Sequence, residues 1–291
     1  MPSTQELTRR IKSIKSTRKI TRAMQMVSAA KMRKAQNATL ASRNYAQLAS
    51  ELIAGIGNVE KYENPLLAEY PNAKKVGVLL ITTNRGLVGG FNTNLMNKVR
   101  ELRLDEPELI SELISVGKKG ADGISRTEWP LLAKFPKHDS TELVKDVYPI
   151  VQLITDSFKS GEYRKILVVY NHFVSTLEQR PTAKVLLPFS WESEATEDKE
   201  NINTWTQTFE PDRRKVLEHL LPRVLESQIY QAILESDASE HSARMVMMKN
   251  ATEAAGELID DLTLTYNQLR QNKITTELSE ITAGRIALES N

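Results

Sequence analysis

The C-terminal stretch of this 291-residue chain constrains the fold more than any other feature. After Pro222 it contains no proline and, before Gly284, the single glycine Gly256, so little interrupts a helix. Two rows of residues repeat every seven positions, which is typical of a helix packed along another long helix. The rows are Ala238, Met245, Thr252, Ile259 and Tyr266, and His241, Met248, Ala255, Leu262 and Leu269. A helix of about 65 residues would be roughly 100 Å long. One globular core cannot bury such a helix, so the pattern predicts a helical partner.

A second long helix is predicted over residues 3–57. Ser3 and Glu6 have the spacing of a capping box at its start, and Gly57 with its neighbours marks its end. The predicted apolar face consists of Leu7, Ile11 and Ile14, then, after a step in phase, Ile20, Met24 and Val27, and finally Tyr45, Leu48 and Leu52. Small and unbranched residues in the middle of this helix allow a close approach to a second helix.

The two ends of the chain carry opposite charge, although the formal net charge is only +2. Residues 1–43 contain eleven basic residues and one acid, Glu6, whereas residues 235–291 contain ten acids and five basic residues. The two helices can therefore lie together with attraction. Two alternatives for the basic N-terminal stretch are a mitochondrial transit peptide and a nucleic-acid-binding helix. Against them stand the uninterrupted helical pattern, the scarcity of aromatic residues and the opposite charge at the other end of the chain.

Strand and helix patterns alternate over residues 75–190. Apolar runs predict strands at residues 76–81, 109–116 and 166–170, and helices are expected at residues 92–103, 118–126 and 141–160. Residues 173–177 and 183–187 are predicted to pair as a hairpin or as edge strands. Residues 191–210 are rich in acidic residues and are expected to form a loop before the closing helix. This alternation indicates an α/β layer domain with a Rossmann-like arrangement.

The predicted fold class is therefore α/β, with a long antiparallel coiled coil of the N- and C-terminal helices and an inserted Rossmann-like α/β domain. The expected divisions are residues 1–58 for the N-terminal coiled-coil helix, 75–190 for the α/β globular domain and 210–291 for the C-terminal coiled-coil helix. Part of the C-terminal helix is left over to contact other chains.

No group of residues predicts catalysis. The glycine-rich residues 86–90 follow a strand and precede a helix, as phosphate-binding turns do, but they fit neither the dinucleotide nor the P-loop pattern and are more readily explained as a tight turn. His138, His172, His219 and His241 lack metal-ligand spacing, and the chain has no cysteine. Asp260, Asp261 and Glu257 form a solvated face. We therefore predict no catalytic residues, no cofactor and no metal. No apolar run reaches the ~18 residues of a membrane span.

Several sequence blocks follow one another along the chain: residues 11–15 (IKSIK), 26–35 (MVSAAKMRKA), 83–92 (TNRGLVGGFN), 226–230 (ESQIY), 238–245 (ASEHSARM), 250–252 (NAT) and 274–280 (ITTELSE) with Gly284. Together these blocks resemble the gamma subunit of F-type ATP synthases over essentially the whole chain. Their order along the chain argues against a chance match. Thr83 and Asn84 replace the usual Ser-Asp, Val88 replaces a common Cys, and Arg285 follows Gly284 where a small residue is usual.

The resemblance implies a central-stalk rotor without an active site of its own. It implies that the chain transmits torque between the membrane c-ring and the catalytic ring of alpha and beta subunits, whose beta subunits carry the nucleotide chemistry. The implied partners are the alpha and beta subunits, the epsilon subunit and the c-ring, with no nucleic acid. The implied location is peripheral to the membrane, on the cytoplasmic side of the bacterial plasma membrane in preference to the mitochondrial matrix side. The implied partner-contact residues are Met24, Lys31, Arg33, Arg270, Gln271, Thr275 and Glu277.

Overall fold

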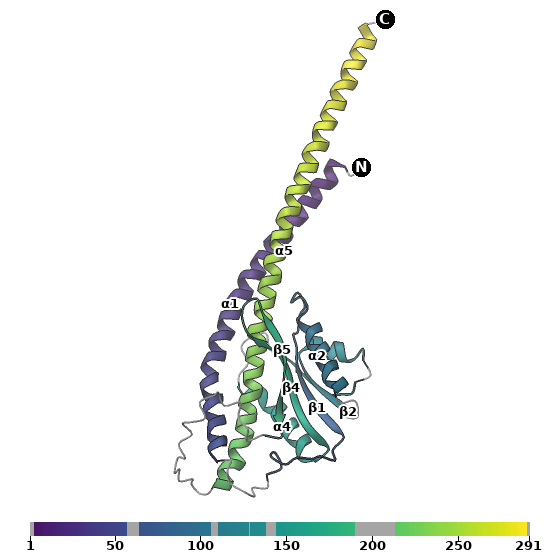
Figure 1. The fold of residues 1–291 in the computed structure, drawn as a ribbon. Coiled ribbons are helices and arrows are strands. Elements are labelled where there is room, and N and C mark those ends of the chain that lie inside the picture. Colours follow the sequence, from purple (N-terminus) through teal and green to yellow (C-terminus); the bar gives the residue numbers. More distant parts are fainter. Residues whose placement is uncertain are drawn as a thin grey trace. The chain divides into compact units, whose positions relative to one another are not determined.

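In the computed structural model, two long helices form the two ends of the chain, and a five-stranded sheet is inserted between them in the sequence (Figure 1). The structure describes residues 3–56, 64–105, 110–127, 129–137, 144–189 and 213–289. Helix α1 covers Thr4–Ile56 and helix α5 covers Arg213–Glu289. The predicted α/β fold class with long terminal helices is therefore confirmed. The predicted acidic loop at residues 191–210 and His138 lie outside the described residues, as do the side chains of Tyr45, Leu48 and Leu52.

The start of α1 follows the predicted capping pattern in part. The amide of Glu6 donates a hydrogen bond to Ser3 Oγ at 3.1 Å, which satisfies one of the unpaired donors of the first turn. The Glu6 carboxylate accepts a hydrogen bond from Arg10 Nη2 at 2.6 Å, one helical turn further on. The cap is thus a serine cap followed by an ion pair along the helix.

The sheet has the strand order β3-β2-β1-β4-β5, with parallel pairing throughout except for the antiparallel edge strand β5. Between α1 and α5 the chain forms β1 (Lys75–Ile81), α2 (Phe91–Asp105), β2 (Ile110–Val116), α3 (Lys118–Ile124), β3 (Leu131–Phe135), α4 (Val144–Lys159), β4 (Tyr163–Phe173) and β5 (Gln179–Leu187). Strand β1 is central, which explains its uninterrupted apolar run.

Helices cover both faces of this sheet. Leu79 and Ile81 of β1 belong to an apolar cluster with residues of α4 and α5, among them Ile154 and Ile233. The alternate side chains of β1, such as Leu80, pack in a second cluster with residues of α2 and α3. Each fully buried aliphatic side chain of this kind contributes about 1.5–3 kcal/mol. The inserted domain therefore has a core of its own, one side of which is completed by α5.

The strand predicted at residues 173–177 was wrong beyond Phe173, and one strand of the sheet was not predicted. Residues 174–178 do not form a strand: β4 runs on to Phe173, and Ala183 of β5 pairs with Val169 rather than with residues 173–177. The edge strand β3 was not predicted at all, because Leu131 and Leu132 are exposed and the run is short. The antiparallel pairing of residues 183–187 as an edge strand is confirmed, with a different partner.

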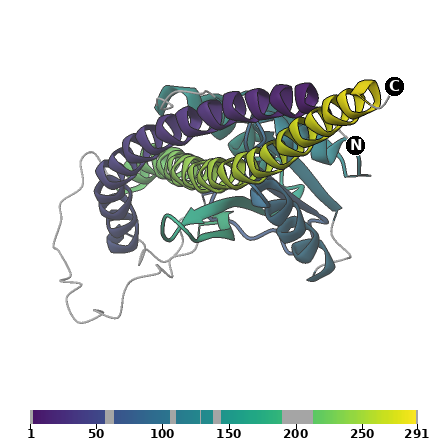
Figure 2. The ribbon, with the colours of Figure 1, turned by 90° about the horizontal axis from the view of Figure 1, so that it is seen from above.

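Residues 224–243 of α5 are buried or half-buried around the whole helix. One side packs on the sheet through residues such as Ile229 and Ile233. Another side meets α1, where Met32, Ala35 and Thr39 are buried. In Figures 1 and 2 this part of α5 runs alongside α1. A helix enclosed in this way does not show the one-sided apolar stripe of a surface helix.

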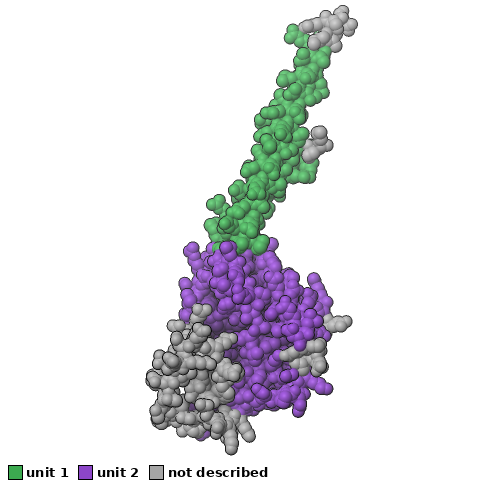
Figure 3. Space-filling model, in the orientation of Figure 1, with its two compact units in different colours: residues 1–28, 245–291 green, residues 29–244 purple. Residues whose placement is uncertain are grey.

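The chain divides into two compact units, residues 1–28 with 245–291 and residues 29–244 (Figure 3). In the first unit, α1 and α5 pair: Thr252 Oγ1 donates to Thr21 Oγ1 at 2.8 Å, and the Arg18 guanidinium lies against Gly256. All ten residues of the two predicted rows on α5 are buried or half-buried, so the predicted seam is confirmed.

The predicted inner face of α1 was wrong in its middle part. Ile20 and Val27 are 58% and 57% exposed. The inward positions continue the 3-4 spacing of Leu7, Ile11 and Ile14 through Thr21, Gln25 and Ser28, without the predicted step in phase. Polar residues therefore occupy part of the seam, and apolar residues face outward.

Candidate functional site

The glycine-rich turn after β1 is held by side chains of its own chain. Leu87 and Gly89 have positive φ angles of 63° and 60°. Asn92, near the start of α2, accepts a hydrogen bond from the Thr83 amide at 3.2 Å and donates one to Thr83 Oγ1 at 2.8 Å. Thr83 Oγ1 donates in turn to the Arg85 carbonyl at 2.7 Å. This network explains the turn as a structural feature.

Two neighbouring side chains connect this turn to the rest of the carboxyl edge of the sheet. Asn84 donates to the carbonyl of Lys137 and accepts from the amide of Lys118. Thr82 Oγ1 accepts a hydrogen bond from the Gly120 amide at 2.8 Å. The amides at the start of α3, which could otherwise face an anion, therefore bond to the residues that directly follow β1: Lys118 to the Asn84 side chain, Lys119 to the Thr83 carbonyl and Gly120 to the Thr82 side chain.

Helix α5 contacts the edge of the sheet between β1 and β4. In open α/β sheets, ligands bind outside the carboxyl ends of the strands at the point where the strand order reverses. Here Asn171 Nδ2, at that end of β4, donates to the Phe91 carbonyl at 3.3 Å. Ser239 Oγ of α5 donates to the Asn171 carbonyl at 2.9 Å. The position of a nucleotide in that class of fold is thus occupied by contacts within the chain.

A buried ionic cluster joins Lys137, which follows β3, to helix α5. Lys137 Nζ lies 2.7 Å from Asp237 Oδ1 and 2.9 Å from Glu240 Oε2, and the lysine side chain is 3% exposed. Arg244 Nη2 donates to the other oxygen of Glu240 at 2.8 Å. Burial alone would raise the pKa of Glu240, but Lys137 and Arg244 lower it to about 2. Burial alone would lower the pKa of Lys137, but the two carboxylates raise it above its ordinary value.

A second polar chain runs from β4 through α5 to α1. His172 Nδ1 lies 2.6 Å from Glu235 Oε2, and Gln231 Nε2 donates to Glu235 Oε1 at 2.9 Å. Ser42 Oγ of α1 donates to Gln231 Oε1. The sequence analysis did not predict either polar group. The acidic residues within an otherwise apolar stretch of α5 were the only signal.

The predicted partner-contact residues fall on two stretches. Met24 is half-buried in α1, and Lys31 and Arg33 have exposed side chains further along the same helix. Arg270, Gln271, Thr275 and Glu277 all lie on α5, where every side chain from residue 270 to residue 285 is exposed. We call this exposed segment, residues 270–285, the α5 tip. Two contacts in this segment lie within the helix: Thr275 Oγ1 donates to the Gln271 carbonyl at 3.0 Å, and Lys273 Nζ lies 3.7 Å from Glu277 Oε1.

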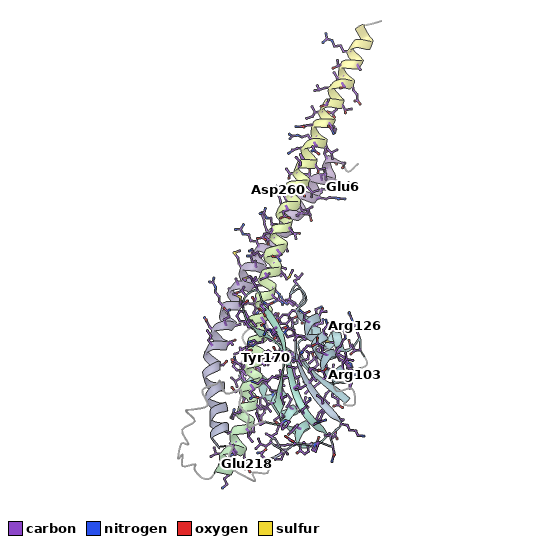
Figure 4. The ribbon with its side chains drawn as sticks, in the orientation of Figure 1. Glu6, Arg103, Arg126, Tyr170, Glu218 and Asp260 are labelled. Carbon is purple, nitrogen blue, oxygen red and sulfur yellow. The ribbon has the colours of Figure 1, made fainter. Side chains whose placement is uncertain are left out.

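Figure 4 shows the side chains of both units, with Glu6 and Asp260 labelled on the paired helices and Tyr170 labelled within the sheet. Asp260, Asp261 and Glu257 are exposed, as predicted for a solvated face. Among the described residues, no group of three or more metal-ligating side chains comes together. No helix in the described part of the chain is long and apolar enough to cross a membrane.

The fold defines a class of protein: a pair of long terminal helices with an inserted α/β domain and an exposed C-terminal helical segment. Comparison with known proteins identifies the family. The family described as ATP synthase matches residues 3–288. The ATP synthase gamma chain of Roseiflexus castenholzii is 44% identical and that of Nitrosomonas europaea 37% identical, and each covers 99% of this chain and at least 99% of the relative. The chain belongs to the ATP synthase gamma chain family, as the sequence blocks predicted.

Solved structures show the same fold. A chain of the Euglena gracilis mitochondrial ATP synthase, in a structure of its OSCP, F1 and c-ring parts, superposes with a TM-score of 0.72 and 19% identity over 99% of this chain and 95% of that chain. A chain of the Tetrahymena thermophila central stalk and c-ring gives a TM-score of 0.60 with 23% identity, over 80% of this chain and 99% of that chain. The α/β fold with long terminal helices is therefore that of these stalk chains.

Proposed function

We propose that the chain is the central-stalk rotor subunit of a proton-translocating ATP synthase. It transmits torque between the membrane c-ring and the catalytic alpha/beta ring and drives the binding change at the beta-subunit sites. The observation that supports this function most directly is the change in burial along helix α5. The chain is also 44% identical to a gamma chain over its full length. One part of α5 is enclosed by the sheet and α1, the next pairs with α1, and the α5 tip is exposed.

The chain is a non-catalytic subunit in this proposal, and ATP is made or hydrolysed by its partners. The bonds at the carboxyl edge of the sheet support this: Asn92, Asn84 and Ser239 occupy positions where α/β enzymes hold ligands. No cofactor or metal is assigned to the chain. Its contribution to catalysis is mechanical.

The proposed partners are the alpha and beta subunits of the catalytic ring, the epsilon subunit and the c-ring of the membrane sector. We assign contacts with the catalytic ring to the seven residues Met24, Lys31, Arg33, Arg270, Gln271, Thr275 and Glu277. The α/β domain, residues 75–190, would contact epsilon and the c-ring, while residues 1–58 and 210–291 form the shaft. The chain would lie peripheral to the membrane, on the cytoplasmic side of a bacterial plasma membrane.

Exposed charges suit contacts that have to be broken and remade. Lys31 and Arg33 have exposed side chains, and a surface ion pair contributes only ~0–1 kcal/mol. Contacts of this strength between a shaft and a surrounding ring would steer the shaft without holding it in one position. The apolar residues Ile20 and Val27, which face outward from the same helix, add a surface without charge.

A tagged chain purified from membranes tests the proposal. We expect it to retain alpha, beta, epsilon and c subunits, identified by mass spectrometry. Deleting residues 270–291 should weaken assembly with the ring or the coupling of ATP hydrolysis to proton movement. The matched control is Lys249→Ala, which removes an exposed charge from α5 outside the α5 tip. A chain that is a stable monomer and never retains ATPase subunits would contradict the proposal.

A further inference from the structure

Torque has to pass between the inserted α/β domain and helix α5, so the contacts between them decide how stiff a rotor built on this fold is. Apolar packing resists separation, but it is non-directional and fixes rotation and register weakly. Hydrogen bonds and ion pairs depend on distance and angle, so they fix both. The polar contacts between the domain and α5 are therefore the place to look for the element that determines stiffness.

These polar contacts gather on about two turns of α5. They join Glu235 to His172, Asp237 and Glu240 to Lys137, Ser239 to the carbonyl of Asn171, and Ser242 to the carbonyl of Thr176. The contact of Lys137 differs from the others in two ways. It is ionic and almost completely buried, and its single ammonium group bonds carboxylates on successive turns of the helix.

The lysine is also fixed on the side of the domain. The Lys137 carbonyl accepts a hydrogen bond from Asn84 Nδ2, and Asn84 Oδ1 accepts one from the amide of Lys118. Glu240 is held on the other side by Arg244, whose Nη2 donates at 2.8 Å. The bond from Asn84 thus holds the backbone of Lys137, and the bond from Arg244 holds the carboxylate of Glu240.

We propose that Lys137, Asp237 and Glu240 form a torsional lock that fixes the α/β domain in rotation and register on α5. The three residues are positioning residues for torque transmission and take no part in ATP chemistry. Weakening the lock leaves the domain attached by apolar packing, but allows it to twist further about α5 under load. This inference rests on the proposed rotor function.

The stiffness of the assembled complex is the quantity to measure. The chain has no cysteine, so one introduced cysteine gives it a single attachment point. The catalytic ring, assembled with the full chain, is fixed to a surface and a bead is attached at Lys159→Cys, an exposed position at the end of α4. The angular spread of the bead during a catalytic pause reports the torsional stiffness between the α/β domain and the ring.

Two variants weaken the lock without leaving an unpaired buried charge of large cost. Asp237→Asn keeps the volume and a hydrogen-bond acceptor but removes one charge. The pair Lys137→Met with Asp237→Leu replaces the ion pair by apolar side chains and keeps the bond between Arg244 and Glu240. Such replacements are often neutral for stability. We expect unchanged thermal stability and a wider angular spread, larger for the double variant.

The control attaches the bead at His219→Cys, an exposed position on α5 itself. Torque then reaches the bead without crossing the lock, so the spread should stay the same in every variant. An unchanged spread at the Lys159→Cys attachment would overturn the proposal, and so would equal widening at both attachments. If the double variant fails to assemble, the angular spread of the Asp237→Asn complex alone tests the proposal. A wild-type complex that fails to assemble or rotate would contradict the rotor function itself.

Discussion

At the scale of single residues, His241 makes the stability of the chain depend on pH. It is half-buried on α5, and burial lowers its pKa from 6.5 to about 4. Arg244 Nη1 lies 3.5 Å from His241 Nδ1, and because arginine only donates, this nitrogen is the acceptor of the neutral ring. The folded protein therefore holds His241 uncharged at neutral pH.

We expect this residue to destabilise the fold in mild acid. The unfolded chain binds the proton first as the pH falls below 6.5, so stability present above that pH is lost between pH 6.5 and pH 4. The loss amounts to at most about 3 kcal/mol for a shift of this size. His241→Gln should remove much of the difference between the free energies of unfolding at pH 7 and pH 4.5, measured with urea.

The comparison for this prediction is His219→Gln. His219 is exposed on the same helix, so this variant controls for the loss of a histidine side chain at a solvent-accessible position. Should His241→Gln and the wild type lose the same free energy of unfolding on acidification, another group would be responsible.

At the scale of elements, helix α3 approaches Ser115 of β2 and Thr82, the residue that follows β1, so closely that only glycine fits at one position. A Cβ atom added at Gly120 would lie 2.7 Å from both Ser115 Oγ and Thr82 Oγ1. Gly120 also donates its amide to Thr82, which keeps α3 in this place. The approach is therefore part of the architecture at the carboxyl edge of the sheet.

Two glycine substitutions should have opposite outcomes. Gly120→Ala should lower the free energy of unfolding by about 1–3 kcal/mol because the added methyl group overpacks the contact. Gly86→Ala should be neutral or slightly stabilising, by up to about 1 kcal/mol, since its added methyl group meets no atom within 4 Å. Denaturant unfolding of both variants checks this, and equal effects would contradict the close approach.

Helices and strands could be predicted from the sequence where their own residues carry the pattern, and not where the pattern depends on neighbouring elements. Strand β1 has a continuous apolar run because both faces are buried, and it was predicted. Strand β3 lies at the edge of the sheet, is short and has exposed leucine side chains, so it lacks such a run. The pairing of β5 could not be predicted because it depends on where β4 ends. The inner face of α1 was misassigned at Ile20 and Val27, because the partner helix accepts polar residues there.

The only local signal for the ionic contact of Lys137 was the presence of acidic residues in a stretch of α5 that is otherwise largely apolar. Lys137 and Glu240 are 103 positions apart, and although Glu240 stands in the block 238–245, nothing in that block indicates a lysine partner. Only the folded sheet brings the end of β3 to α5. The family, by contrast, could be predicted from short blocks of sequence, while the partner-contact residues remain predictions that await the pull-down and the α5 tip deletion.

At the scale of the whole molecule, the two parts of α5 beyond the sheet should respond differently to the same substitution. Ile259 lies on the seam with α1 and is 6% exposed, whereas Ile274 in the α5 tip is 49% exposed. Ile259→Ala should lower the free energy of unfolding of the chain by about 2–4 kcal/mol. Ile274→Ala should change it little, and should instead weaken assembly with the ring.

Both isoleucine variants can be followed by urea unfolding of the chain and by the yield of assembled complex. Loss of chain stability in Ile274→Ala would show that the α5 tip is packed within the chain. Full stability in Ile259→Ala would show that the seam contributes little to holding α1 and α5 together.

The pairing of α1 with α5 also has a consequence for biosynthesis. Thr21 and Thr252, which bond across the seam, are 231 positions apart. At the usual ~5–20 residues per second, α1 emerges from the ribosome about 10–50 s before its partner. We expect the inserted domain to gain its sheet during this interval, while α1 waits without the helix that will cover it. The polar residues Thr21, Gln25 and Ser28 on the inner face of α1 are favourable during this interval, because a fully apolar face would promote aggregation of nascent chains.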